Sequence, residues 1–174
     1  MAGVKTLADG NPRVKILPAK PVDKNAITLT EANAATAKYA SSRILFSDFD
    51  LGPTGSETVD EKPLDATGNA QSFGLSNYGG GFTVLRFFDP ATKIADDDDD
   101  WLYELVKEKG TVLHVYVRDT AKLATEVDAV GDEYSYYEVI VDDLVRGDRT
   151  GYIKYRVACA VQDAALQRKV VAGA

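Results

Sequence analysis

Residues 111–118, TVLHVYVR, indicate the fold class because apolar and other side chains alternate along them. In an extended chain, alternate residues point to the same face, so Leu113, Val115 and Val117 would line one side of a strand. Residues 133–141 (EYSYYEVIV) and 151–161 (GYIKYRVACAV) alternate in the same way. Such repeated patterns predict antiparallel strands that bury one face in a shared core.

Further segments extend this β pattern in both directions. Residues 82–88 (FTVLRFF) and 43–49 (RILFSDF) are expected to be strands, and 166–171 a last, short one. The one clear helix is expected at about 98–109, where apolar residues recur at helical spacing before a glycine. The prediction is a mostly β (α+β) fold of two packed antiparallel sheets, sandwich- or barrel-like, with one flanking α-helix and a long loop.

The chain is expected to divide at residue 41. Residues 1–41 contain turn signals and two prolines around an extended piece, so we interpret them as an N-terminal arm and lead-in element. Residues 42–174 would form the β-sandwich domain. The segment from Met1 to Pro18 carries charges throughout, so we expect no signal peptide.

A polar segment at 52–81 is too long for an ordinary loop of a compact domain. It is rich in Gly, Ser, Thr, Asn and acids, with possible short strands at 56–60 and 71–75. Loops of this length without regular structure are usually functional or disordered. We therefore expect a functional excursion that rejoins the sheet at Gly79–Gly81.

Nothing in the sequence favours an enzyme or a cofactor. His114 is the single histidine and lies inside a predicted strand, and Cys159 is a single cysteine within an apolar run, so both are interpreted as packing residues. The run Asp96–Asp100 lacks the spacing of a calcium loop and is interpreted as a solvated start of the helix. A net charge of −7 argues against a conventional nucleic-acid-binding surface.

Several segments, taken in their order along the chain, together resemble the major tail tube proteins of long, flexible-tailed bacteriophages, particularly those that infect actinobacteria. They are ITLTEA at 27–32, the stretch 43–64, SNYGG at 76–80 before the aromatic strand, the acidic patch before Trp101, KGT at 109–111 and GYIKYRV at 151–157. The likeness extends over nearly the whole chain and rests on order and composition, because no single segment is diagnostic.

The resemblance implies a structural subunit without catalytic activity. Six copies would form a ring, and rings would stack into a hollow tube through which DNA is ejected into the host. The partners would be further copies of the chain, the tape measure, tail terminator and distal tail proteins, and DNA that passes without specific binding; no membrane is involved. The protein would be made and assembled in the host cytoplasm and reside in the virion tail.

Two surfaces are candidates for assembly under this interpretation. The candidate inter-ring residues are Thr54, Ser56, Glu57, Asp60, Pro63, Asn77, Tyr78, Gly79 and Gly80. The candidate acidic assembly or lumen surface consists of Asp96, Asp97, Asp98, Asp99 and Asp100. A negative lumen would repel DNA phosphates and let the genome slide.

Two alternatives stay open at this point. The chain could be another virion β-domain, such as a tail terminator or capsid decoration protein, which would form closed oligomers without open-ended stacking. It could also be a carbohydrate-binding module that stacks sugars on Tyr134, Tyr136, Tyr137 and Trp101.

Overall fold

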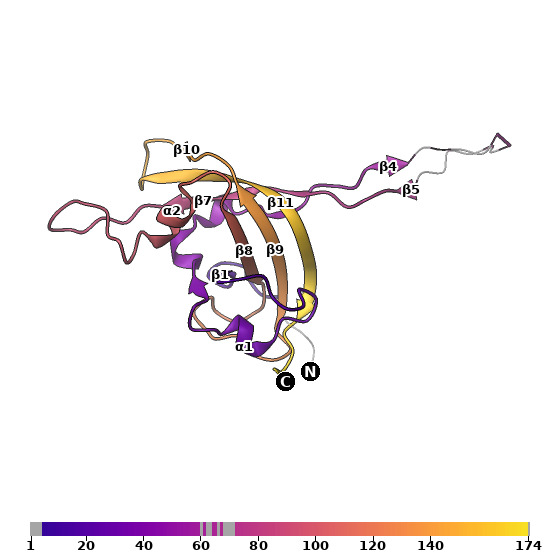
Figure 1. The fold of residues 1–174 in the computed structure, drawn as a ribbon, viewed down its shortest axis with the longest axis horizontal. Helices are drawn as coiled ribbons and strands as arrows, with labels where there is room; N and C mark the ends of the chain where they lie inside the picture. Colours follow the sequence, from indigo (N-terminus) through magenta and orange to yellow (C-terminus); the bar gives the residue numbers. More distant parts are fainter. Residues whose placement is uncertain (1–4, 60, 62–63, 66, 68–71, 174) are drawn as a thin grey trace.

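A computed structural model describes residues 5–59, 61, 64–65, 67 and 72–173. Its main feature is a seven-stranded antiparallel sheet that curls around a core (Figure 1). The elements in chain order are β1 (Arg13–Leu17), α1 (Leu29–Ala32), β2 (Lys38–Tyr39), the 3₁₀ turns η1 (Ser41–Arg43) and η2 (Phe46–Asp48), β3 (Gly52–Pro53), β4 (Thr58–Val59), β5 (Ser72–Phe73), β6 (Tyr78–Gly79), β7 (Gly81–Leu85), α2 (Trp101–Val106), β8 (Val112–Arg118), β9 (Glu133–Val141), β10 (Val145–Arg146) and β11 (Lys154–Lys169).

The strands of the large sheet follow the order β10-β11-β9-β8-β1-β2, and β7 also pairs with β11. Strand β11 connects two parts of this sheet: residues 154–158 pair with β7, and residues 159–169 pair with β9. Register shifts after Val161 and Ala165 bend this long strand, because a bulge adds an unpaired residue and increases the local twist. The mostly β prediction is confirmed, since strands make up 37% of the described residues and helices 10%.

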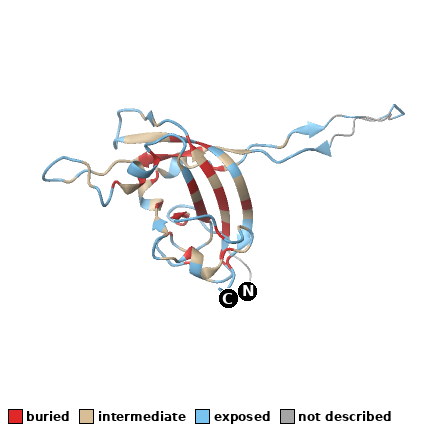
Figure 2. Ribbon diagram, in the orientation of Figure 1, coloured by how far each residue is buried: buried red, intermediate tan, exposed pale blue. Residues whose placement is uncertain are grey.

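The large sheet is buried on both faces, as the red bands on β8 and β9 show (Figure 2). One face carries the predicted stripe Leu113, Val115 and Val117, packed with side chains of β1, β7, β9, β11 and α2. The other face carries a smaller cluster beneath α1 and the neighbouring loops. The members of that cluster are Leu17, Ile27, Ala32, Tyr116, Tyr134, Tyr136, Ala165 and Val170.

Three predicted elements differ from the structure. Residues 43–49 do not form a strand: η1 and η2 occupy this stretch, and only Ile44 makes an isolated bridge, to Val84. Helix α2 covers Trp101–Val106 instead of 98–109, because the aspartates before it form turns and Lys107 ends it. Residues 166–169 belong to β11 and do not begin a separate strand.

Residues 13–17, inside the expected N-terminal arm, form a fully buried strand of the large sheet. Strand β1 pairs with β8 along its whole length and with β2 on its other side. Val14 and Ile16 enter the main core, while the alternate side chains Arg13 and Lys15 point to the other face. This strand therefore closes one side of the curl, and the chain's first forty residues contribute to the core.

Candidate assembly surfaces

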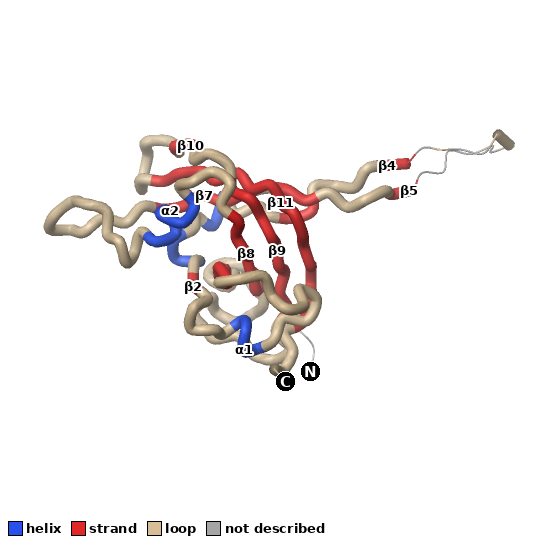
Figure 3. The backbone as a smooth tube through the Cα atoms, in the orientation of Figure 1, coloured by secondary structure: helices blue, strands red, loops and turns tan. Residues whose placement is uncertain are grey.

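The described residues between Gly52 and Gly79 belong to a long hairpin, which we call the arm, that extends away from the rest of the chain, the body (Figure 1). Two short strand pairs hold it together, β3 with β6 near the body and β4 with β5 further out. Between them, the Thr54 amide donates to the Asn77 carbonyl over 2.9 Å, and the Gly74 amide donates to the Glu57 carbonyl over 2.7 Å. Figure 3 shows that the rest of the described arm is loop. Within the short strands predicted at 56–60 and 71–75, β4 covers Thr58–Val59 and β5 covers Ser72–Phe73, while residues 60 and 71 lie outside the described residues.

The arm exposes apolar side chains that nothing in the described chain covers. Phe73 and Leu75 are 82% and 85% exposed, and Val59 and Leu64 are also exposed. Figure 2 shows pale blue over almost the whole arm, in contrast to the body. Several large apolar groups gathered on a projecting segment typically mark an interaction site.

The predicted inter-ring residues lie along this arm as far as the structure describes them. Thr54, Ser56 and Glu57 lie on its outgoing strand, Asn77, Tyr78 and Gly79 lie on its return, and Gly80 follows directly. Asp60 and Pro63 lie outside the described residues. Those that are described thus share one projecting hairpin.

Two glycines attach the returning strand of the arm to the body. The Cys159 amide donates to the Gly80 carbonyl over 3.0 Å, and the Gly81 amide donates to Asp50 Oδ1 over 2.7 Å. A Cβ on Gly81 would lie 2.0 Å from the Val157 carbonyl oxygen. Gly80 has φ +109°, a backbone conformation that glycine adopts at little cost. The glycines therefore allow the backbone to lie against β11 where the arm rejoins the sheet.

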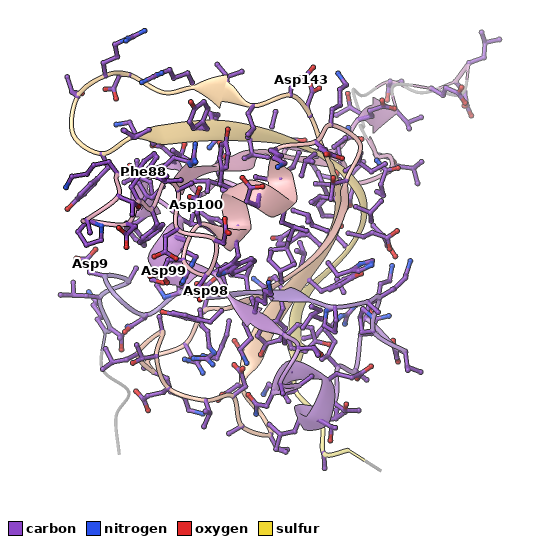
Figure 4. All side chains as sticks on the ribbon, turned by 60° about the vertical axis from the view of Figure 1, so that its left-hand side comes forward. Asp9, Phe88, Asp98, Asp99, Asp100 and Asp143 are labelled. Atoms are coloured by element: carbon purple, nitrogen blue, oxygen red, sulfur yellow. The ribbon has the colours of Figure 1, made fainter. Side chains whose placement is uncertain are left out.

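The predicted acidic surface separates into groups with different roles (Figure 4). Asp100 is only 1% exposed; its carboxylate accepts from Arg86 Nε over 2.7 Å and from the Phe87 amide over 3.0 Å. Asp96 accepts from the amides of Asp98 and Asp99, which closes the turn before α2. Asp97, Asp98 and Asp99 are exposed and Asp96 is partly exposed, so Asp100 is the member of the run that cannot face a partner or a lumen.

One exposed acid of this run is also paired. The Asp99 carboxylate lies 2.6 Å from Arg43, whose guanidinium also lies over the rings of Phe87 and Trp101. These contacts hold the turn before α2 against η1. The described residues contain no group of three or more His, Cys, Asp or Glu side chains arranged to hold a metal ion.

A buried charge cluster was not predicted from the sequence. Asp128 is fully buried and lies 2.6 Å from Lys15 Nζ, 3.2 Å from Arg118 Nη1 and 3.4 Å from Arg13 Nε. Burial lowers the pKa of Lys15, although the neighbouring Asp128 carboxylate opposes this shift. The cluster attaches the 119–132 loop to β1 and β8. The only signal for it was the alternation of charged and apolar residues in RVKIL at 13–17, which indicates a strand but not its partner.

The three tyrosines of β9 do not form an exposed stacking surface. Tyr134, Tyr136 and Tyr137 are all buried. The Tyr134 hydroxyl donates to the Lys24 carbonyl over 2.8 Å, and the Tyr136 hydroxyl lies 2.9 Å from His114 Nδ1. Of the four rings named for the carbohydrate-binding alternative, these three cannot stack on a sugar, and only Trp101 is partly exposed.

The comparisons with known proteins complete this description. No helix among the described residues is both long and apolar enough to cross a bilayer. No curated protein matches the chain. A family model described as "Phage tail tube protein" matches residues 1–174. The chain therefore belongs to the phage tail tube protein family.

Proposed function

We propose that this structural tail protein assembles with copies of itself into rings, six subunits each by the resemblance described above, that stack into a hollow conduit for DNA ejection. The phage would be long- and flexible-tailed and infect an actinobacterium. The tape measure, tail terminator and distal tail proteins would be its other partners, and assembly would take place in the host cytoplasm. The observation that carries this proposal is the arm with its exposed Phe73 and Leu75.

The arm supports stacking because it cannot bury its own apolar groups. None of the described arm residues between Gly52 and Gly79 belongs to either core cluster. Burying a side chain the size of Phe or Leu contributes about 1.5–3 kcal/mol. A neighbouring subunit that covers several such groups would therefore gain much of the free energy needed for a stable contact.

Pairing within a ring is supported by a free sheet edge. In the described structure, residues 160–169 of β11 have a strand partner on the β9 side only. Unpaired edges readily accept a strand from another chain. In a closed ring each such edge would be covered by the next copy. The net charge of −7 suits a conduit that DNA passes without adhering.

Negative-stain electron microscopy of an arm-deleted variant tests this proposal. Because Thr54 and Asn77 already hydrogen-bond to one another, residues 55–76 can be replaced by a two-residue Asn-Gly turn. Concentrated wild-type protein is expected to form hollow tubes of uniform width, whereas the variant should remain folded and give only single rings or monomers.

Circular dichroism of the variant serves as the control for folding. Tubes formed by the arm-deleted protein would contradict the role of the arm in stacking. Closed wild-type rings that never stack would instead favour a tail terminator or capsid decoration protein.

A further inference from the structure

We infer that the arm of one subunit docks on a specific surface of the next subunit, the hairpin of β10 and the start of β11 at residues 145–156, which we call the basic hairpin. This inference rests on the proposed function, because it names the surface that receives the arm. The occupant is a second copy of this chain. The inference is carried by the complementary charge and apolar character of two surfaces that face away from each other.

The arm is acidic as well as apolar. Glu57, Glu61 and Asp65 are exposed, and the described arm residues include no Lys or Arg. Asp60 and Lys62, outside the described residues, have opposite charges. The arm therefore has a net charge of −3 over 52–79, in addition to the exposed Phe73 and Leu75.

The basic hairpin has the opposite charge. It contains four basic side chains and one acidic side chain, a net charge of +3: Arg146, Arg149, Lys154, Arg156 and Asp148. Lys154 pairs with Asp148 at 2.6 Å and Arg156 with Asp50 at 2.6 Å. Arg146 and Arg149 are exposed and make no ion pair with a described residue. Two guanidinium groups are thus available on a protein whose overall charge is −7.

Exposed apolar groups lie beside these arginines. Tyr152 is 77% exposed, and Val145 and Ile153 are also exposed. Aromatic residues and arginine are the types most enriched where protein interfaces gain their binding energy. An arginine can also lie over an aromatic ring such as that of Phe73. The basic hairpin therefore offers both contacts that the arm requires.

Within one subunit, the outer part of the arm and the turn of the basic hairpin lie apart. Figure 1 shows the arm leaving one side of the body, while the turn between β10 and β11 lies on the opposite side. A contact between two different surfaces is heterologous, and repeated heterologous contacts give a closed ring or an open stack. This geometry agrees with an assembly of identical subunits in which each copy both gives and receives an arm.

The neighbouring surfaces are acidic, and this makes them unfavourable docking sites for the acidic arm. Asp97, Asp98 and Asp99 are exposed in the turn before α2, and the groove beside Trp101 is lined in part by Asp97 and Glu104. Like charges placed opposite each other would repel the arm. The basic hairpin combines exposed apolar groups with a net positive charge, which these surfaces do not.

Charge reversal in the full-length protein tests the inference by sedimentation velocity over a concentration series. The hairpin variant is Arg146→Glu with Arg149→Glu, and the arm variant is Glu57→Lys with Glu61→Lys. Each is expected to weaken self-association at least tenfold, because two attractive contacts become repulsive. A chain with all four substitutions is expected to recover most of the association, since the charges again oppose each other.

A matched control changes the charge elsewhere by the same amount. Lys5→Glu with Lys93→Glu alters two exposed residues that lie outside the arm, the basic hairpin and the free edge of β11. This control is expected to associate like the wild type. The wild-type association should also weaken between 0.15 and 0.5 M salt, because exposed charges are screened over about 8 Å at the lower concentration.

The possible results separate the inference from the proposed function. If the wild type associates and the hairpin variant associates equally well, the inference is overturned while tube formation stands. If the four-fold variant stays as weak as the hairpin variant, the two surfaces do not contact each other. A wild type that remains monomeric at all concentrations also overturns the inference, and the proposed function is then judged on tails assembled in infected cells.

Discussion

The body and the arm of this protein differ in how far they bury their apolar side chains. In the body, both faces of the large sheet are covered, so Phe82 is 0% exposed. In the arm, two-residue strand pairs carry Phe73 at 82% exposure. An isolated two-stranded hairpin has little stability in water. The body therefore folds on contacts within its own chain, whereas an ordered, covered arm requires a partner.

The reactivity of thiols provides the largest expected contrast between the two regions. Burial raises the pKa of Cys159 to about 12. At neutral pH its thiolate fraction is then about 3,000-fold lower than that of an ordinary thiol with a pKa of about 8.5. In a Leu75→Cys variant, the arm thiol should react with Ellman's reagent within seconds, and Cys159 only after unfolding. Rapid reaction of two thiols per native chain would show that the core around β11 opens readily.

A matched pair of phenylalanine substitutions compares the two regions energetically. Phe82→Ala is expected to lower the free energy of unfolding by about 3–5 kcal/mol, because it leaves a cavity in the main core. Phe73→Ala is expected to change it by less than about 0.5 kcal/mol. Urea denaturation followed by tryptophan fluorescence measures both values. Similar losses in the two variants would mean that the arm packs on its own body.

A pair of glycine substitutions tests the point where the arm joins the body. Gly81→Ala is expected to destabilise the protein by about 1–3 kcal/mol, since the new methyl group would overlap the Val157 carbonyl. Gly52→Ala, on the opposite strand of the arm, meets no atom within 4 Å and should cost less than about 0.5 kcal/mol. Thermal unfolding distinguishes them, and equal melting temperatures would contradict the close packing of Gly81 on β11.

Strict alternation of apolar residues was sufficient to predict β8, β9 and the first part of β11. It failed at 43–49, where Ile44 and Phe49 still contact the core but consecutive 3₁₀ turns bring them there. Apolar residues five apart can reach a core from a turn as well as from a strand. The pattern therefore identified buried residues in this segment and not its backbone conformation.

Strand β1 and the surfaces proposed for docking show what one sequence cannot reveal. Lys15 is separated from Asp128 by more than a hundred residues, so the neutralising partner that allows its burial is visible only in the fold. In the same way, the alternation over 151–161 predicted a strand but not the surface to which its basic residues Lys154 and Arg156 belong. Their position opposite the arm depends on how the sheet curls.

The long strand β11 also has a mechanical consequence. It is hydrogen-bonded to β7 and β10 at its start and to β9 along the rest, and the arm returns into β7. Tension applied to the arm along its returning strand is therefore passed to β11 as shear between antiparallel strands, which must break many hydrogen bonds together instead of one after another. If neighbouring subunits bind the arm, tension along the tube would be transmitted through the backbone of β11 into the centre of each subunit.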